Sequence, residues 1–455
     1  MSAVAAGGPR VAVVGAGWAG LAAACEAVRR GAALTLYEAS AQAGGRARSL
    51  VWRQGPRPLT VDNGQHLLVG AYRETLALIE CLGGRPEALF TRLPLSLART
   101  DGVSLRAARL PAPWHLALGL LGARGLPWRA RFDSARLLAS LRRSGWVTDP
   151  GLTVEQLLDR CRQGEPAREL LWRPLCVSAL NTRSFEASAR VFAAVVRDTL
   201  GARAADSDFL VPAVPLSELL PGLTLPFLAR HGAEVRLRTA VRALARTPRG
   251  LQLATADGYR AFDAVVLAVP PPRAAALIGS LTREARDPTR TRSGERPACP
   301  GFSFDYRPIT TVYLRWPGRP HRLPALVMLP TEPRRGWHGQ WLFGHRLADG
   351  GSLAAVVISA DGPHRRLGRS ELAQACVAQL RANLGLPDAE ATLVLDEKRA
   401  TFACTPELRR PPLDMLAGRE PGLWLAGDYV DSEYPATLEA AVRSGLAAGA
   451  RAAAA

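Results

Sequence analysis

Three glycines near the start of the chain have the spacing of a phosphate-binding turn: Gly15, Gly17 and Gly20. They follow a short apolar run and open an alanine-rich stretch with a helical pattern. In such a turn, one glycine permits the bend, one lets the backbone approach a pyrophosphate, and one lets helix and strand pack closely. Glu38 ends the next apolar run, where a carboxylate accepts a hydrogen bond from a ribose hydroxyl. The unit predicts a dinucleotide whose adenosine ribose lacks a 2′-phosphate.

A second unit of strand and acid closes the chain. Residues 423–428, LWLAGD, form a strand pattern that ends in Asp428, and a helical pattern begins after Pro435. The first turn of that helix would offer unpaired backbone N–H groups to an anionic or electron-rich partner. Taken alone, Asp428 is equally a helix-capping acid, so its assignment to a cofactor depends on the opening motif.

The composition excludes several classes of protein. The net charge is +18, but arginine carries nearly all of the positive charge, Lys398 is the one lysine, and the arginines are scattered. We therefore expect no nucleic-acid partner, whereas an anionic membrane surface remains compatible with this charge. The seven cysteines form no C-x-x-C pair, so we expect reduced thiols and no metal site. No apolar run reaches 18 residues, which favours a cytoplasmic protein, at most peripheral on the inner face of the membrane.

The hydrophobic pattern places these motifs in an α/β fold. Residues 11–14 and 34–37 are predicted strands, and a helix is predicted over 71–84. Residues 86–224 have the pattern of helices interrupted by proline and glycine. An extended segment at 234–244, a meander around 251–259 and a buried strand within 262–274 follow. Four further runs predict an antiparallel sheet, a helix is expected near 369–384, and 287–301 has the composition of a linker. The four runs are 309–316, 325–329, 340–344 and 353–359.

These motifs together resemble the FAD-containing amine oxidase and phytoene desaturase superfamily. Gly44, Gly45 and Arg46 match the family loop that lies against the pyrophosphate, and Val241 falls where a backbone contact meets the adenine. Asp428 matches the acid at the ribityl–phosphate region, and the segment after Pro435 matches the helix start that faces the flavin pyrimidine ring. The resemblance implies non-covalent FAD bound by Gly15, Gly17, Trp18, Ala19, Gly20, Glu38, Gly44, Gly45, Arg46, Gly64, Val241, Gly427, Asp428, Ala436, Thr437 and Leu438.

The resemblance also implies the domain organisation. A Rossmann-like FAD-binding domain of the GR2 type would be assembled from residues 1–85, 225–290 and 396–455. An inserted α+β substrate domain would comprise a helical region, 86–224, and a mixed or antiparallel sheet with a helix, 291–395. No second G-x-G-x-x-G is present for a nicotinamide, which makes NAD the weaker cofactor candidate and implies an external electron donor.

Departures from the superfamily pattern favour an isoprenoid substrate over an amine. Thr437 stands where amine oxidases commonly carry an aromatic cage residue, and the run 309–316 has no lysine. The stretches VDNGQHLLVG at 61–70 and EKRATFACTP at 397–406 resemble the squalene-associated FAD-dependent desaturases. These are the hydroxysqualene dehydroxylases of hopanoid biosynthesis. The resemblance implies reductive removal of the hydroxyl of hydroxysqualene to give squalene, a C30 polyene.

Such a reaction needs an acid beside the flavin. Asp62 and His66 are the catalytic candidates, because the superfamily brings this loop close to the isoalloxazine; ordinary turn-forming roles compete with this interpretation. Asp431 and Glu433 are more typical of solvated loop acids, and Cys404 is a weak candidate for covalent flavin attachment.

Two other functions and one surface property stay open from the sequence. A carotenoid-type desaturase would run hydride transfer in the opposite direction, and a non-enzymatic prenyl-binding escort would use the fold without flavin chemistry. The escort interpretation predicts decayed flavin motifs, whereas both ends of this chain are intact. Residues 110–132 combine an apolar run with Trp114, Trp128 and three arginines, which suits either contact with one membrane leaflet or an internal helix of the substrate domain.

Overall fold

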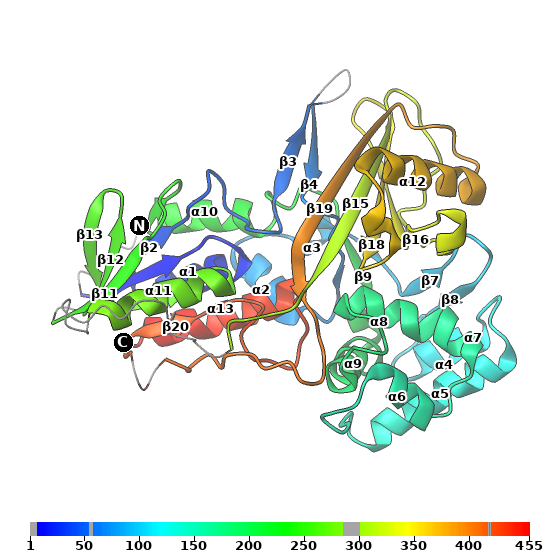
Figure 1. Cartoon of the computed structure of the whole chain (residues 1–455), viewed down its shortest axis with the longest axis horizontal. Coiled ribbons are helices and arrows are strands. Elements are labelled where there is room, and N and C mark those ends of the chain that lie inside the picture. The colour runs from blue at the N-terminus through cyan, green and yellow to red at the C-terminus, as the bar shows by residue number, and fades with distance from the viewer. Residues whose placement is uncertain (1–6, 54–57, 249, 285–300, 417, 419) are drawn as a thin grey trace.

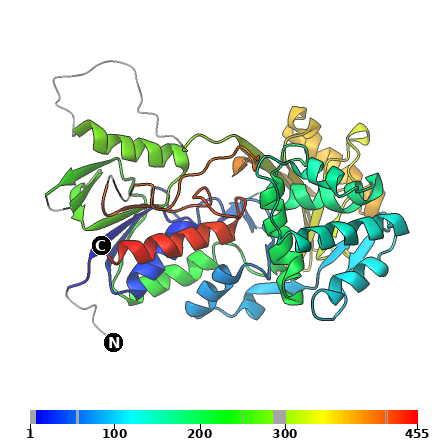
Figure 2. The same cartoon turned by 90° about the horizontal axis from the view of Figure 1, so that it is seen from below.

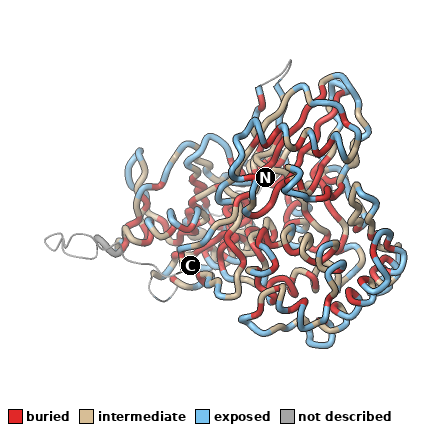
Figure 3. The backbone as a smooth tube through the Cα atoms, turned by 45° about the vertical axis from the view of Figure 1, so that its right-hand side comes forward, coloured by how far each residue is buried: buried red, intermediate tan, exposed pale blue. Residues whose placement is uncertain are grey.

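The computed structural model describes residues 7–53, 58–248, 250–284, 301–416, 418 and 420–455. These residues form two lobes, one built on a parallel sheet and one on an antiparallel sheet with a helical layer beside it (Figure 1). Buried residues run through the interior of both lobes, and exposed residues cover the outer helices and loops (Figure 3). The α/β fold with a Rossmann-like sheet and an antiparallel substrate-domain sheet is confirmed.

Five short strands form the parallel sheet in the order β10-β2-β1-β14-β20. Their apolar runs are buried because helices and a meander cover both faces of the sheet. The helices α1 (Trp18–Arg29), α10 (Leu220–Arg230) and α13 (Leu438–Ala452) pack together on one side. The strands are β1 (Arg10–Val14), β2 (Ala33–Tyr37), β10 (Glu234–Arg236), β14 (Ala264–Leu267) and β20 (Leu423–Leu425).

The opposite face of the parallel sheet carries an antiparallel meander and a helix (Figure 2). Its members are β11 (Ala243–Thr247), β12 (Gly250–Thr255), β13 (Gly258–Phe262) and α11 (Pro271–Glu284). The extended segment predicted at 234–244 is divided, because β10 joins the parallel sheet and β11 joins the meander. The prolines after β14 end the strand as predicted, and Pro271 also begins α11.

The antiparallel sheet has the order β16-β17-β18-β15-β19. Its four predicted strands and its helix are confirmed: β15 (Tyr306–Trp316), β16 (Leu326–Met328), β17 (Trp341–Arg346), β18 (Ser352–Ser359) and α12 (Arg369–Leu384). A fifth strand, β19 (Ala391–Phe402), pairs along most of β15 and was not predicted, because charged residues break its hydrophobic alternation. One face packs on α12, and the other faces the hairpin of β3 (Ser49–Trp52) and β4 (Leu59–Asp62).

Residues 86–224 are helical over much of their length, but the all-helical expectation is wrong for several short stretches. Strands β6 (Phe90–Leu93) and β5 (Leu68–Val69) pair with β9 (Phe209–Pro212), and β7 (Ser96–Ala98) pairs with β8 (Ser104–Arg106). Most of the expected linker at 287–301 lies outside the described residues. The α-helices between β5 and β9 are α2 (Arg73–Cys81), α3 (Pro86–Leu89), α4 (Trp114–Leu121), α5 (Trp128–Arg143), α6 (Val154–Arg160), α7 (Glu165–Ala167), α8 (Arg173–Leu180) and α9 (Ala189–Val196).

Close packing of α13 on α1 brings the two ends of the chain together. A Cβ added at Gly445 would lie 2.1 Å from the carbonyl oxygen of Ala19, and one at Gly449 would lie 2.3 Å from that of Ala23. Only glycine allows backbones to approach this closely, so these two positions fix α13 against the helix that opens the dinucleotide unit. Within the described residues, no helix is both long and apolar enough to cross a bilayer.

Candidate functional site

The three glycines of the first turn meet three different requirements. Gly15 has φ +103°, and a Cβ there would lie 2.4 Å from the carbonyl oxygen of Ala268. A Cβ at Gly20 would lie 1.8 Å from the carbonyl oxygen of Gly15, so both residues are required by the fold itself. A Cβ at Gly17 would meet no protein atom closer than the Cα of Gly45, at 4.0 Å. The fold does not need glycine at position 17, and the open space there suits a ligand that approaches the backbone.

The N-terminus of α1 is available to an anion. Gly17 is its N-cap and supplies no capping side chain, and no acidic residue lies in its first turn. The first N–H groups of a helix without a cap attract phosphate oxygens. The Trp18 side chain is buried in the lobe core, so Trp18 and Ala19 would contribute backbone N–H groups to a ligand.

Glu38 lies at the end of β2, beside the glycine turn. One carboxylate oxygen accepts hydrogen bonds from the backbone N–H and hydroxyl of Ser40, both at 2.8 Å, and the other accepts the N–H of Ala16 at 2.7 Å. The segment leading to Val241 is tied to the same place, because the N–H of Thr239 donates to the carbonyl oxygen of Glu38 at 2.8 Å. The Val241 carbonyl oxygen accepts a hydrogen bond from Arg273, so its backbone is held near the predicted adenosine contacts.

An ion pair joins the opening motif to the closing motif. Arg46 donates to the carboxylate of Asp428 at 2.6 Å and to the carbonyl oxygen of Ala400 on β19 at 2.6 Å. Before it in the loop, Gly44 and Gly45 have φ of +116° and +63°, and the N–H of Gly44 donates to the carbonyl oxygen of Ala16 at 2.8 Å. Residues separated by 382 positions thus share one polar centre at the carboxyl ends of β1 and β20.

The start of α13 is held beside that centre. Thr437 caps the helix by accepting the N–H of Ala440 at 3.1 Å, which leaves the first N–H groups, at Leu438 and its neighbour, to other acceptors. Ala436 is partly exposed next to them. Ser444 bonds both backbone groups of Gly427 at 2.9 Å, so the helix and the end of β20 are fixed to each other.

Glu439 has a structural role that the sequence did not indicate. Its side chain is fully buried, and its carboxylate accepts the N–H groups of Glu74 and Thr75 at 3.1 and 3.0 Å and the Thr75 hydroxyl at 2.7 Å. Arg443 donates to the same carboxylate at 2.9 Å. Glu439 therefore caps α2 and fixes the start of α13, and none of these bonds involves the glycine motifs.

The loop that contains Asp62 and His66 lies where the two lobes meet. Asp62 ends β4, and its Oδ1 atom accepts the Ser49 hydroxyl at 2.8 Å and the N–H of Leu216 at 2.9 Å. The Tyr313 hydroxyl on β15 donates to the Asp62 carbonyl oxygen at 3.0 Å. Burial raises the pKa of the Asp62 carboxyl, and the two hydrogen bonds oppose that shift.

The structure favours one tautomer of His66. Its Nδ1 lies 2.9 Å from the carbonyl oxygen of Gly64, which can only accept, so Nδ1 carries the proton and Nε2 keeps its lone pair. Burial lowers the pKa of His66, with the Gly64 hydrogen bond and the charge of Asp62 acting in the opposite direction. The neutral ring presents an acceptor at Nε2, and the partly buried Asp62 carboxyl has its pKa shifted upward from the ordinary value of an aspartate.

Neighbours of this loop come from strands that the sequence did not link to it. The amide of Asn63 donates to the carbonyl oxygen of Arg46 at 3.3 Å and to Glu397 of β19 at 3.4 Å. The Gln65 side-chain oxygen lies 3.3 Å from Nε2 of His345 on β17. Glu397 belongs to the stretch 397–406, which resembles the squalene-associated family in sequence, but Tyr313 and His345 gave no signal, because their strands have only a core pattern.

The remaining candidate acids point elsewhere. Glu433 pairs with Arg197 at 2.8 Å and stays 65% exposed, and Asp431 lies 3.7 Å from Arg410 with 59% exposure. Cys404 is buried, and burial raises its thiol pKa to about 12, which leaves almost no thiolate at neutral pH for covalent attachment to a flavin. Among the described residues, no cluster of histidine, cysteine and acidic side chains is arranged to hold a metal ion.

The polar centre suits a dinucleotide with a flavin ring. It combines the unfilled space at Gly17, two helix N-termini, the Glu38 carboxylate and the Arg46–Asp428 pair. Next to Asp428, the Tyr429 hydroxyl is buried without a hydrogen-bond partner in the described part of the chain. An unpaired buried hydroxyl is costly, and a ribityl or phosphate oxygen at this position would satisfy it.

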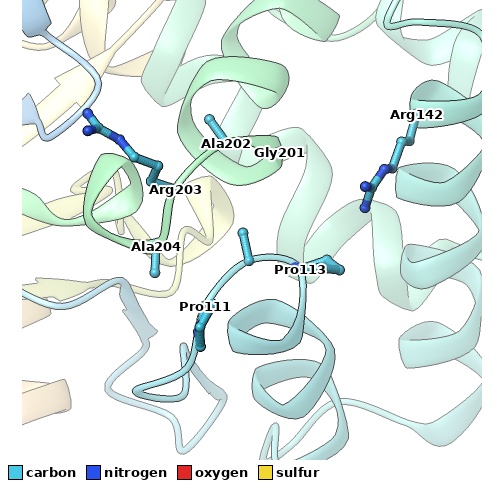
Figure 4. A pocket seen from close by; sticks show the side chains of 8 residues that line it. Pro111, Pro113, Arg142, Gly201, Ala202, Arg203 and Ala204 are labelled. Atoms are coloured by element: carbon cyan, nitrogen blue, oxygen red, sulfur yellow. The ribbon is translucent and has the colours of Figure 1, made fainter.

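Two hollows lie in the helical layer, away from this centre. A small cavity of about 40 Å³ is lined entirely by apolar side chains from β7, β8, α4, α5, α8 and the segments that flank them, among them Leu97, Leu116, Leu138 and Trp172. A wider surface hollow of about 430 Å³ lies between the start of α4, the end of α5 and residues 201–204. Figure 4 shows Pro113 and Arg142 on different sides of it, with Arg203 directed away from Arg142. It contains none of the motif residues.

Comparison with known proteins gives consistent results over nearly the whole chain. Residues 18–453 match the family described as flavin containing amine oxidoreductase. The chain is 32% identical to the hydroxysqualene dehydroxylase of Rhodopseudomonas palustris, covering 95% of this chain and 96% of that protein. It is 30% identical to the hydroxysqualene dehydroxylase of Sinorhizobium fredii, covering 95% of each. An oxidoreductase from Methanosarcina mazei shares the fold, with a TM-score of 0.70 at 13% identity over 96% of this chain and 99% of that one.

Proposed function

Because this chain belongs to the flavin-containing amine oxidoreductase family, we propose that it is an FAD-dependent dehydroxylase that converts hydroxysqualene to squalene. The observation that carries the proposal is the placement of the loop 62–66. This loop, one of the two stretches that favoured this branch of the family, lies against the Arg46–Asp428 centre through Asn63. Relatives at about 30% identity with this activity support the same substrate class.

We propose that non-covalent FAD spans from Glu38 to the start of α13. Glu38 would hold the adenosine ribose, with the backbone near Val241 beside the adenine. The N–H groups at the start of α1 and the loop of Gly44 and Gly45 would hold the pyrophosphate. The start of α13 would stabilise negative charge on the flavin ring through its unpaired N–H groups. Bound there, FAD supplies a hydride donor and acceptor.

The reaction requires one C–O bond to break and one C–H bond to form. An allylic alcohol, a hydride and a proton give the alkene and water, so the carbinol carbon is reduced by two electrons. The protein must protonate the leaving oxygen and exclude water from the carbon that receives hydride. We assign proton delivery to the loop 62–66, with Asp62 as the proton-holding group, because burial raises its pKa. His66 Nε2 would accept the substrate hydroxyl and orient it.

The apolar interior of the helical layer supports a hydrocarbon substrate. Ten apolar side chains, with no charged one, line the cavity between α4, α5 and α8. Its volume is far below that of a C30 chain, so binding of the proposed substrate requires these helices to separate or the chain to extend beyond this cavity. The escort alternative is disfavoured by the intact polar centre, since a protein without flavin has no use for the open space at Gly17.

Anaerobic turnover in deuterated water tests the proposed reaction. Chemically reduced holoenzyme is mixed with hydroxysqualene, and the hydrocarbon product is analysed by mass spectrometry. We expect squalene with one deuterium at the former carbinol carbon, because the hydride comes from a position that exchanges with solvent before transfer. Squalene without deuterium would contradict hydride delivery from the cofactor. Oxidised enzyme that instead desaturates squalene or phytoene would favour the carotenoid-type reaction.

A further inference from the structure

The outer surface of α4 and the start of α5 exposes an unusual concentration of apolar side chains. Eleven large hydrophobic residues are exposed in the described part of the chain, and six of them lie within residues 110–132. We call these six the α4–α5 patch: Leu110, Trp114, Leu118, Leu121, Trp128 and Phe132, which are 40–64% exposed. Both tryptophans of the segment belong to it. A soluble surface normally disperses such residues, so their grouping indicates an interaction site.

Helix geometry places these side chains on one surface. Trp114, Leu118 and Leu121 have the i, i+4, i+7 spacing that forms a single stripe along α4. On α5, the rings of Trp128 and Phe132 lie 6.5 Å apart. Arg131 joins the two groups, because its guanidinium donates to the Leu121 carbonyl oxygen and lies 4.2 Å from the Trp128 ring centre. The stripe on α4 therefore continues onto the start of α5.

The positive charge around the patch indicates which kind of partner would bind there. Between Asp101 and Asp133 the chain has no acidic residue and five arginines: Arg106, Arg109, Arg124, Arg129 and Arg131. Within the described residues, none of these five forms an ion pair with a carboxylate. Tryptophan favours the headgroup boundary of a bilayer, and arginines whose charge is not neutralised by a carboxylate attract anionic lipid headgroups. A second copy of the chain would oppose arginine with arginine, which disfavours self-association through this surface.

We propose that the α4–α5 patch is a docking surface for an anionic lipid bilayer. The eight residues of α4 would extend about 12 Å as a helix, far less than the roughly 30 Å of a hydrocarbon core. The patch therefore lies in one leaflet with the helices parallel to the surface. Arg124 and Arg129 contact headgroups, while Trp114 and Trp128 mark the boundary of the acyl region.

The opposite face of α4 lines an apolar cavity, so docking would bring the membrane close to the interior of the helical layer. Leu116 and Leu120 point inward and line the apolar cavity, together with Leu138 of α5. The surface hollow continues along the same elements, because Pro113 and Arg142 stand one turn from Leu116 and Leu138. A lipid-soluble molecule in the docked leaflet would therefore need to pass only the single layer of α4 to reach an apolar interior.

Vesicle co-sedimentation of the holoenzyme tests the docking without turnover, so its result is independent of the proposed reaction. We expect wild type to pellet with phosphatidylcholine vesicles that contain about one-third phosphatidylglycerol. Binding should weaken at high salt and with phosphatidylcholine alone, because screening and loss of anionic lipid remove the arginine contribution. Trp114→Ser with Leu118→Ser should lower the partition coefficient by at least about tenfold, and Arg124→Gln with Arg129→Gln by about 25-fold.

Matched controls separate this surface from general effects of charge and hydrophobicity. Tyr259→Ser removes a 72% exposed ring from β13 in the other lobe, and Arg85→Gln with Arg230→Gln removes two exposed arginines elsewhere. These variants should bind vesicles as wild type does. Retained FAD and an unchanged circular dichroism spectrum establish folding, and Phe132→Ser is the second apolar variant if the double variant misfolds.

Three results would overturn the proposal. One is wild type that stays in the supernatant with anionic vesicles. Another is a folded patch variant that pellets as well as wild type. The third is light scattering that shows a wild-type dimer converted to monomer by Trp114→Ser with Leu118→Ser, since the patch would then be an interface between copies of this chain.

Discussion

Replacement of Gly17 and Gly20 by alanine separates the glycine that serves a ligand from the glycine that serves the fold. Gly17 has φ −71° and ψ 175°, a conformation that alanine adopts without strain, and its added Cβ would have no protein atom closer than 4.0 Å. The same change at Gly20 would place a Cβ 1.8 Å from the carbonyl oxygen of Gly15. The two substitutions are chemically identical and lie three residues apart in one turn.

The structure predicts that the two substitutions change the stability of the apoprotein in opposite directions. Gly17→Ala should stabilise the apoprotein by about 0.4–1 kcal/mol, because alanine lowers the entropy of the unfolded chain. If the pyrophosphate contacts the backbone here, the methyl group displaces it from one or two charge-assisted N–H bonds of about 1.5–3 kcal/mol each. We therefore expect the FAD dissociation constant to rise by at least about tenfold if one bond is lost, and by about a hundredfold or more if two are lost. Gly20→Ala should instead destabilise the apoprotein by several kcal/mol, because backbone must move apart.

Thermal unfolding of the apoproteins and fluorescence titration with FAD measure these two quantities separately. The expected pattern is a raised midpoint with weak FAD binding for Gly17→Ala, and a lowered midpoint for Gly20→Ala. Gly17→Val extends the series with a larger side chain in the same space. Gly17→Ala protein that binds FAD as tightly as wild type would refute the placement of the pyrophosphate at this turn.

Three further predictions concern buried ionisable groups. Glu439→Gln should destabilise the holoprotein by on the order of 2–3 kcal/mol in thermal unfolding, because the α2 cap loses its charge, whereas Glu433→Gln at 65% exposure should change little. If the protonated Asp62 carboxyl supplies the proton, turnover should fall as pH rises through its raised pKa, and Asp62→Asn should abolish that limb of the pH–rate profile while retaining FAD. Burial lowers the pKa of His364 from 6.5 to about 4, so its contribution to stability is present above pH 6.5 and is lost as pH falls toward 4. His364→Gln should flatten the acid side of stability measured by urea unfolding, and an unchanged slope would contradict this assignment.

The opening motif could be predicted from sequence because its causes are local. The positive φ of Gly15 and the contact between Gly20 and the Gly15 carbonyl oxygen both arise within one strand–turn–helix unit, and Glu38 lies at the end of the next strand, although Gly15 also packs against the distant Ala268. Strand and helix periods in the antiparallel sheet were readable for the same reason. By contrast, β19 was missed, since the charged residues near Glu397 break its pattern and only pairing with β15 makes it a long strand.

The role of Glu439 could not be predicted, because its partners are 364 and 365 residues away in sequence. In the sequence it belongs to a motif at a helix start, where an acidic residue would be assigned to the helix dipole or to the cofactor. The close packing of α13 on α1 brings this helix start beside α2, and the carboxylate then satisfies N–H groups of that helix. The helix after Pro435 could be predicted from the sequence, but the role of Glu439 depends on long-range packing.

The anchoring of the loop 62–66 determines how its substitutions must be interpreted. The Oδ1 atom of Asp62 accepts hydrogen bonds from the Ser49 hydroxyl and the Leu216 N–H, and its carbonyl oxygen accepts one from the Tyr313 hydroxyl on β15. Loss of the carboxylate would therefore loosen the loop as well as remove a proton source. Tyr313→Phe removes one anchor and leaves every titratable group of the loop in place. If Asp62 is the acid, Tyr313→Phe should lower the turnover rate and leave the shape of the pH–rate profile unchanged. Asp62→Asn should change the shape of that profile.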